Sequence, residues 1–234
     1  MLPEHPAGHR KPQALRLYRM RGRVGLFFVA GLSVLAGMTD AIGFLASGDF
    51  VSFMSGNTTR LAVALSDGHL ELVARLALLI ATFVVGNALG VIIARSSRKR
   101  AWPLLALTAL LLLTAGLCGE RFEVLALLAA ILAMGMLNAA VEEVNGLPIG
   151  LTYVTGALSR FGRGLGRWLM GERRAGWRMQ LVPWGGMLSG AVLGGWLEHH
   201  MGFAALLASS LLAAMLGLAS LLIPRRWVQR YMAR

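Results

Sequence analysis

Charged side chains, cysteine and recognisable catalytic motifs are all scarce in this sequence. Only 15% of the 234 residues are charged, which argues against an ordinary soluble domain, where about 25% is usual. The single cysteine, Cys118, excludes an internal disulfide framework. G-x-S-x-G and H-E-x-x-H are absent, and His199 and His200 lack acidic or cysteine partners at metal-binding spacing. We therefore expect neither an enzyme nor a bound metal or other cofactor.

Apolar residues, in contrast, make up 56% of the chain and fall into continuous blocks. Each block has about twenty residues, the length at which an α-helix crosses the ~30 Å hydrocarbon layer. Because the blocks do not alternate with period two, they favour helices over a β-barrel. We predict an all-α integral membrane protein with six transmembrane helices, at residues 24–45, 72–94, 101–118, 124–144, 179–198 and 203–223.

The basic residues are distributed unevenly between the two sides that these spans define. The net charge is +12, and 20 of the 23 Lys and Arg residues lie before the first span or after the second, fourth and sixth. Only Arg60, Arg75 and Arg121 lie on the other side. The positive-inside rule then predicts that both termini are cytoplasmic. We expect anionic lipid headgroups, not nucleic acid, as partners of the basic cytoplasmic loops.

The two ends of the chain are basic and have little apolar content. Residues 1–20 contain three prolines and are predicted to be a disordered cytoplasmic tail, and residues 224–234 a second basic tail. A secretory signal is disfavoured, because the first span is longer than 20 residues and belongs to a repeat. A single membrane domain is expected over residues 21–223.

Comparison of the chain with itself indicates an internal repeat. Phe53–Arg60 matches Tyr153–Arg160 in its aromatic, hydroxyl, glycine and arginine positions, at an offset of 100 residues. Two further matches follow the same order: Gly37–Ala41 with Gly135–Ala139, at an offset of 98, and Gly86 and Gly90 with Gly190 and Gly194, at an offset of 104. Each half holds three spans, an odd number. We therefore predict that the second half (about 124–223) is inverted relative to the first (about 24–118).

The matched segments around Ser55-Gly56 and Thr155-Gly156 lie between spans. Residues 50–66 would form a helix only about 25 Å long, which is marginal for a full crossing. We predict a short re-entrant or interfacial helix in each half. Two re-entrant helices would meet near the midplane, where secondary transporters bind substrate. The alternative is a pair of amphipathic surface helices capped by Ser or Thr.

Asp40 is the most conspicuous candidate for function, since a carboxylate within a span costs about 2.5–3.5 kcal/mol or more unless it faces protein or water. It either faces the interior or reaches headgroup water at the end of the first span. In the second half, Gly135, Asn138, Glu142 and Asn145 would share one helix face, with Glu142 in a polar relay or merely at a solvated helix end.

The predicted substrate site combines polar side chains and glycine backbones from both halves. Its residues are Asp40, Ser55, Gly56, Asn57, Thr58, Asn138, Thr155 and Gly156. Arg60 and Arg160 could contact anions or lipid, although interfacial snorkelling explains them equally well. Gly186, Gly190 and Gly194 form a ridge of small residues for close helix packing, either within one subunit or between two copies in a homo-oligomer.

Four of these segments carry a resemblance to a known family. Asp40–Phe44, Ser55–Thr58, Gly135–Ala139 and Tyr153–Gly156 resemble the YoaK family of bacterial multi-pass membrane proteins, a domain of unknown function, over about residues 24–223. The resemblance implies a bacterial cytoplasmic (inner) membrane and six spans. Ser55 and Leu137 stand where that family usually has Thr and often has Gln.

Together these patterns predict a small-solute transporter or permease. The rival hypothesis is a non-transporting membrane scaffold or assembly protein, in which the glycine ridges and polar stripes serve helix packing. The two differ in one observable, because a transporter needs a hydrated cavity that reaches both Ser/Thr-Gly elements.

Overall fold

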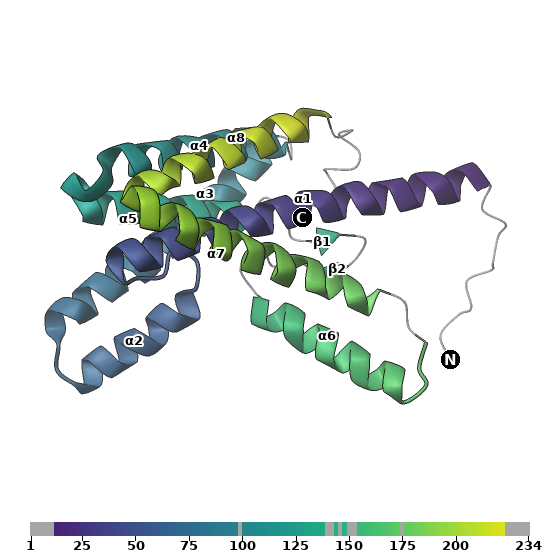
Figure 1. The fold of residues 1–234 in the computed structure, drawn as a ribbon, viewed down its shortest axis with the longest axis horizontal. Helices are drawn as coiled ribbons and strands as arrows, with labels where there is room; N and C mark the ends of the chain where they lie inside the picture. Colours follow the sequence, from purple (N-terminus) through teal and green to yellow (C-terminus); the bar gives the residue numbers. More distant parts are fainter. Residues whose placement is uncertain are drawn as a thin grey trace.

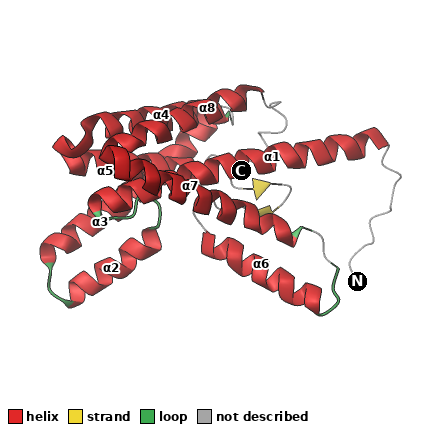
Figure 2. Ribbon diagram, viewed as in Figure 1, coloured by secondary structure: helices red, strands yellow, loops and turns green. Residues whose placement is uncertain are grey.

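The computed structural model describes residues 12–97, 100–138, 143–144, 147–148, 154–173 and 176–222, and almost all of them are helical (Figures 1 and 2). The α-helices are α1 (Pro12–Ser47), α2 (Met54–Ser66), α3 (Leu70–Ser96), α4 (Ala101–Cys118), α5 (Glu123–Leu137), α6 (Val154–Leu169), α7 (Leu181–Met201) and α8 (Leu206–Leu222). Short 3-10 helices precede α5 (η1, Gly119–Phe122), α7 (η3, Trp177–Gln180) and α8 (η4, Gly202–Ala205).

Four helical stretches in the described part of the chain are long and apolar enough to cross a membrane. They are Val24–Ser47, Leu70–Ser96, Ala101–Cys118 and Trp177–Leu222. The last of these includes both α7 and α8, and α5 is apolar but shorter. The prediction of an α-helical membrane protein agrees with this architecture.

Helices that are distant in sequence pack most closely, with α1 against α7, α3 against α5 and α4 against α8. The glycine ridge on α7 explains the first pair, because Gly186 lies against Ala30, Gly190 against Val34 and Gly194 against Met38. A Cβ on Gly186 would lie 2.9 Å from the Ala30 carbonyl oxygen, so the absence of a side chain permits backbone contact. The ridge is therefore used inside one chain.

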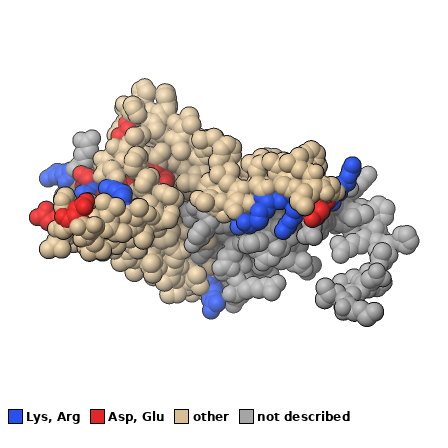
Figure 3. All heavy atoms as spheres, turned by 90° about the horizontal axis from the view of Figure 1, so that it is seen from below, with Lys and Arg blue, Asp and Glu red and all other residues tan. Residues whose placement is uncertain are grey.

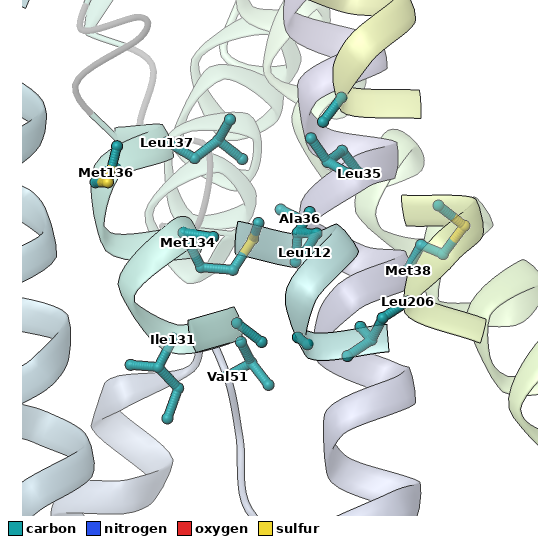
Figure 4. Packing of buried hydrophobic residues seen from close by; sticks show 14 of the residues in the cluster. Leu35, Ala36, Met38, Val51, Leu112, Ile131, Met134, Met136, Leu137 and Leu206 are labelled. Carbon is teal, nitrogen blue, oxygen red and sulfur yellow. The ribbon is translucent and has the colours of Figure 1, made fainter. Parts of the chain in front are cut away.

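The interior between these pairs is filled by aliphatic and methionine side chains (Figure 4). Leu35 and Met38 from α1 lie near Leu112 of α4 and Leu206 of α8, and Met134 of α5 belongs to the same cluster. Val51, from the loop between α1 and α2, joins this core although it lies outside any helix.

The two short helices lie apart from the main bundle, at the lower edge in Figure 1. Each one begins near the middle of the molecule, and the two then run towards opposite ends. Extended packing joins α2 to α3, and α6 to η3 and α7.

The prediction for the fourth span is wrong at its C-terminal end. The α-helix ends at Leu137, and Glu143–Val144 pairs antiparallel with Leu147–Pro148 as strands β1 and β2. The residues between the strands are Asn145 and Gly146, a pair that favours two-residue hairpins. The helix face predicted for Gly135, Asn138, Glu142 and Asn145 therefore does not form, and Glu142 itself lies outside the described residues.

The first helix begins at Pro12, within the segment predicted as a tail. Proline suits a first helical turn, because the N–H that it lacks would have no partner there. Residues 1–11 and the C-terminal segment 224–234 lie outside the described residues.

Candidate functional site

The carboxylate of Asp40 is buried in α1 and holds the loop that leads into α2. The backbone N–H groups of Val51 and Ser52 both donate to its Oδ1, at 2.8 and 2.6 Å. The N-cap residue of α2, Phe53, makes no side-chain capping bond of its own. Asp40 thus supplies, from a neighbouring helix, an acceptor for the two backbone N–H groups that precede the N-cap of α2.

Asn57 closes the same loop from the other side. Its Nδ2 donates to the Phe50 carbonyl oxygen at 2.7 Å, and the Phe50 N–H donates to Asn57 Oδ1 at 3.3 Å. The side chain is fully buried, so these bonds satisfy an amide that would otherwise be costly at this depth. A Cβ on Gly56 would meet the Phe53 ring at 2.5 Å, so this glycine permits the close approach of the aromatic loop.

The hydroxyl groups of the first motif point away from this loop. Ser55 and Thr58 are exposed, and Thr58 Oγ1 donates to the Met54 carbonyl oxygen of its own helix at 2.8 Å. The motif is therefore divided between two functions. Gly56 and Asn57 hold the loop, whereas Ser55 and Thr58 form an accessible polar face on α2.

The second motif has the same division of exposed and covered positions. Thr155 is exposed in the first turn of α6, Gly156 is partly covered, and Asn138 is partly buried at the end of α5. Residues 149–153, which precede α6, lie outside the described residues, so the loop equivalent to 49–53 is not part of this geometry. Extended packing does not join α2 to α6 in the described part of the chain.

A network of four charged residues lies beside the first loop, and the sequence did not predict it. Both oxygens of Asp49 are engaged, with Arg60 Nη1 at 2.6 Å from Oδ1 and Arg75 Nε at 2.7 Å from Oδ2. Arg75 Nη2 also lies 3.1 Å from Glu123 Oε1, at the start of α5. One signal in the sequence is that Arg60, Arg75 and the acidic residues Asp49 and Glu123 all lie on the predicted outer side.

The second half has a simpler contact at the equivalent arginine. Arg160 Nε donates to Gln180 Oε1 at 2.9 Å, which ties α6 to η3 by one hydrogen bond. The predicted anion or lipid contacts Arg60 and Arg160 are thus both occupied by protein partners.

Shallow clefts on the described surface include two that lie outside the Ser/Thr-Gly motifs, although the second contains Glu123 of the charged network. One is lined by Ser96, Ser97, Arg100, Trp102 and Pro103 between α3 and α4. The other extends from Arg121 to Leu128 along η1 and α5. Neither is lined by a residue of the predicted substrate site.

Apolar helices of membrane-spanning length, packed around a hydrophobic core, define a polytopic α-helical membrane protein. The chain belongs to the family described as "Protein of unknown function (DUF1275)", whose model matches residues 28–219. It is also 52% identical over 213 residues to the UPF0700 transmembrane protein RA0705 of Rhizobium meliloti (strain 1021), covering 91% of this chain and 93% of that protein.

No solved structure matches the chain. The family and the relative confirm that this is a membrane protein of a family of unknown function. The YoaK name rests on the motif resemblance alone.

Proposed function

We propose that the protein is a small-solute transporter or permease of the bacterial cytoplasmic membrane, built from two inverted repeats of three spans. The 46-residue stretch Trp177–Leu222 would be about 69 Å long as one helix, more than twice the ~30 Å hydrocarbon layer, so it counts as two spans. Together with α1, α3, α4 and the shorter α5 this makes six. The predicted termini are then both cytoplasmic.

Duplicated glycine contacts are the observation that carries the inverted repeat. Gly37 lies against the carbonyl oxygen of Met187, and its counterpart Gly135 against that of Phe83. The offsets of these two pairs, 98 and 104 residues, are those of the sequence matches. Gly190 against Val34 and Gly86 against Leu132 repeat the correspondence.

The contacts between α4 and α8 agree with the same symmetry. Gly116, late in α4, lies against Leu207 early in α8, and Gly217, late in α8, lies against Leu105 early in α4. The two helices are therefore antiparallel, as a two-fold axis in the membrane plane requires. The burial pattern adds further support, because residues 28–39 and 126–137 are buried and partly buried in the same order.

The short helices carry the transport proposal itself. Residues 54–60 and 154–160 also share one order of exposed and buried positions, and α2 and α6 begin near the middle of the molecule (Figure 1). Half-helices with glycine and hydroxyl residues at midplane depth are typical of transporter substrate sites. Ser55, Thr58 and Thr155 are the accessible polar groups there, while Asp40, Asn57 and Asn138 belong to the supporting structure around them.

The test is a solute screen by thermal shift on the purified full chain, followed by uptake of any hit into proteoliposomes. Ser55→Ala and Thr155→Ala should lower uptake severalfold without changing the melting temperature, since both hydroxyls are exposed. Thr82→Val, at a partly exposed position on α3, is the control. Uptake that is unchanged in both motif variants would sink the proposed site.

The scaffold alternative has a specific observation in its favour. Asp40 and Asn57 are satisfied by the protein itself, as expected if these polar residues only hold the helices together. Asp40→Asn separates the two hypotheses. A transporter that uses the carboxylate loses uptake while it stays folded, whereas a scaffold is only loosened.

Anionic phospholipids are the partners that we propose for the cytoplasmic side. Arg163 and Arg167 are exposed on α6, and Trp168 beside them is half-exposed. A basic helix with an exposed aromatic residue is typical of binding to anionic headgroups.

A further inference from the structure

The four-charge network described above joins every element around the first short helix. Asp49 belongs to the loop after α1, Arg60 to α2, Arg75 to α3 and Glu123 to α5. The Asp49 side chain is only 2% exposed, whereas the two arginines are 36% exposed, so the network extends from the surface inward. Figure 3 shows acidic and basic side chains together at this end of the molecule.

Hydrogen bonds to the backbone extend the network over the whole turn after α1. Arg60 Nη1 donates to the Gly48 carbonyl oxygen at 2.8 Å, and Arg75 Nη2 to that of Ser47 at 3.4 Å. The Asp49 N–H donates to Ser47 Oγ at 3.3 Å. The loop that Asp40 and Asn57 hold at its inner end is therefore held at its outer end by charge.

The second repeat serves as an internal control for this network. Arg60 has a counterpart in Arg160, but Asp49 corresponds to Ile149 and Arg75 to Met179 at the repeat offsets of 100 and 104. At the equivalent place, α6 is held by the hydrogen bond from Arg160 to Gln180, and the Gln180 side chain is uncharged. The short helices α2 and α6 thus differ in their contacts, because ion pairs hold α2 and a hydrogen bond to an uncharged residue holds α6.

We propose that Asp49, Arg60, Arg75 and Glu123 form an outer gate, which keeps the α2 element closed on the side opposite the basic loops. This inference rests on the proposed transport function for its purpose and on the proposed topology for its side. Breaking the gate frees the loop between α1 and α2 and exposes the residues behind it. The α6 element, which the Arg160–Gln180 hydrogen bond holds at the equivalent place, is the end that opens more easily.

The gate can be tested by thiol accessibility in the full chain, without any substrate. Ser52 is buried in the loop between α1 and α2, and Ser52→Cys in a Cys118→Ser background places a single thiol there. Asp49→Asn should raise its rate of modification by a membrane-impermeant maleimide by about tenfold or more in intact cells, because one charge of a buried set is removed. Arg121→Gln, an exposed basic residue on the same side, should leave the rate unchanged.

Three further measurements determine the interpretation. The melting temperature of each variant must stay above the assay temperature, so that global unfolding is excluded. A rise of less than twofold, or an equal rise in intact cells and inside-out vesicles, would overturn the gate. Ser66→Cys, at the exposed end of α2, reports independently which side of the membrane this end of α2 faces. Modification of Ser66→Cys only in inside-out vesicles would overturn the proposed topology and the outer position of the gate together, whereas failure to find any transported solute would bear on the proposed function alone.

Discussion

Asp40 illustrates how a buried carboxylate can be accommodated within an apolar helix. Two backbone N–H groups donate to one of its oxygens, and the N-terminus of α2 lies directly beyond them. Charge-assisted bonds of this kind are about twice as strong as neutral ones. The residue therefore stabilises the turn between α1 and α2 whether or not a solute also approaches it.

We expect Asp40→Ala to lower the free energy of unfolding by about 2–4 kcal/mol, because two buried N–H groups lose their acceptor. Asp40→Asn retains an acceptor oxygen and should cost roughly half as much, since only the charge is lost. Denaturation in detergent, followed by circular dichroism, measures both. Asp67→Asn at the exposed end of α2 is the control and should stay within about 0.5 kcal/mol of the parent. An unchanged free energy of unfolding in Asp40→Ala would contradict the role of Asp40 in holding this loop.

At the scale of the helices, close backbone approach decides which pairs form. The contact of α7 with α1 depends on three glycines at intervals of four, as the sequence predicted for a packing ridge. Van der Waals contact between backbones is the main attraction available in lipid, where burial of apolar side chains supplies little.

Gly190→Ala should therefore destabilise the protein by about 1–3 kcal/mol, as for other overpacked sites, because the new methyl group collides with the Val34 carbonyl. Gly185→Ala on the same helix has open space and should be neutral or stabilising by up to about 1 kcal/mol. Melting temperatures of the two purified variants make the comparison. Equal values would mean that α1 and α7 are not in backbone contact.

The short helix α6 differs from α2 on its exposed face. Arg163 and Arg167 occupy the positions that match Val63 and Asp67 at the offset of 100 residues, so this face is basic on α6 but not on α2. Neutralising Arg163 and Arg167 to Gln should weaken binding to anionic phospholipid by about 1 kcal/mol for each arginine.

The measurement for this surface is the gain in melting temperature when phosphatidylglycerol replaces phosphatidylcholine in nanodiscs. The double variant should lose most of that gain, while Arg121→Gln should keep it. A gain that persists in full in the double variant would place the lipid contact elsewhere.

At the scale of the whole molecule, the two halves are interlocked rather than adjacent. α1 packs on α7 and α5 on α3, so each half contributes one helix to a pair with the other. Neither half can bury its glycine ridges alone. We therefore expect that α1–α4 expressed without the rest of the chain fails to give a stable protein, and that co-expression with the remaining half restores it.

The proposed orientation makes a separate prediction for the intact molecule. Single thiols at Ser66 and at Ser159, both exposed, should react with an impermeant reagent from opposite sides of the membrane in the Cys118→Ser background. The same side for both would contradict the inverted arrangement, since α2 and α6 would then enter from one face.

Much of the fold could be predicted from the sequence, because membrane-spanning length, glycine spacing and charge asymmetry are local properties of the chain. Four of the six predicted spans coincide with helices to within a few residues, and the first lies within the longer helix α1. The fourth does not, because length and hydropathy do not show that its helix ends at Leu137 and that strands β1 and β2 follow.

The site was predictable only in part. The sequence by itself singled out Asp40, Gly56 and Asn57, because an acid within a span is costly and the glycine motif is repeated. Only the tertiary structure decided that Asp40 and Asn57 hold one loop, and that Asp49 unites arginines from α2 and α3. The reason is physical. Hydrogen bonds and ion pairs depend on distances across helices, and those distances are set by which glycine ridges pack together, a choice that no single segment of the chain contains.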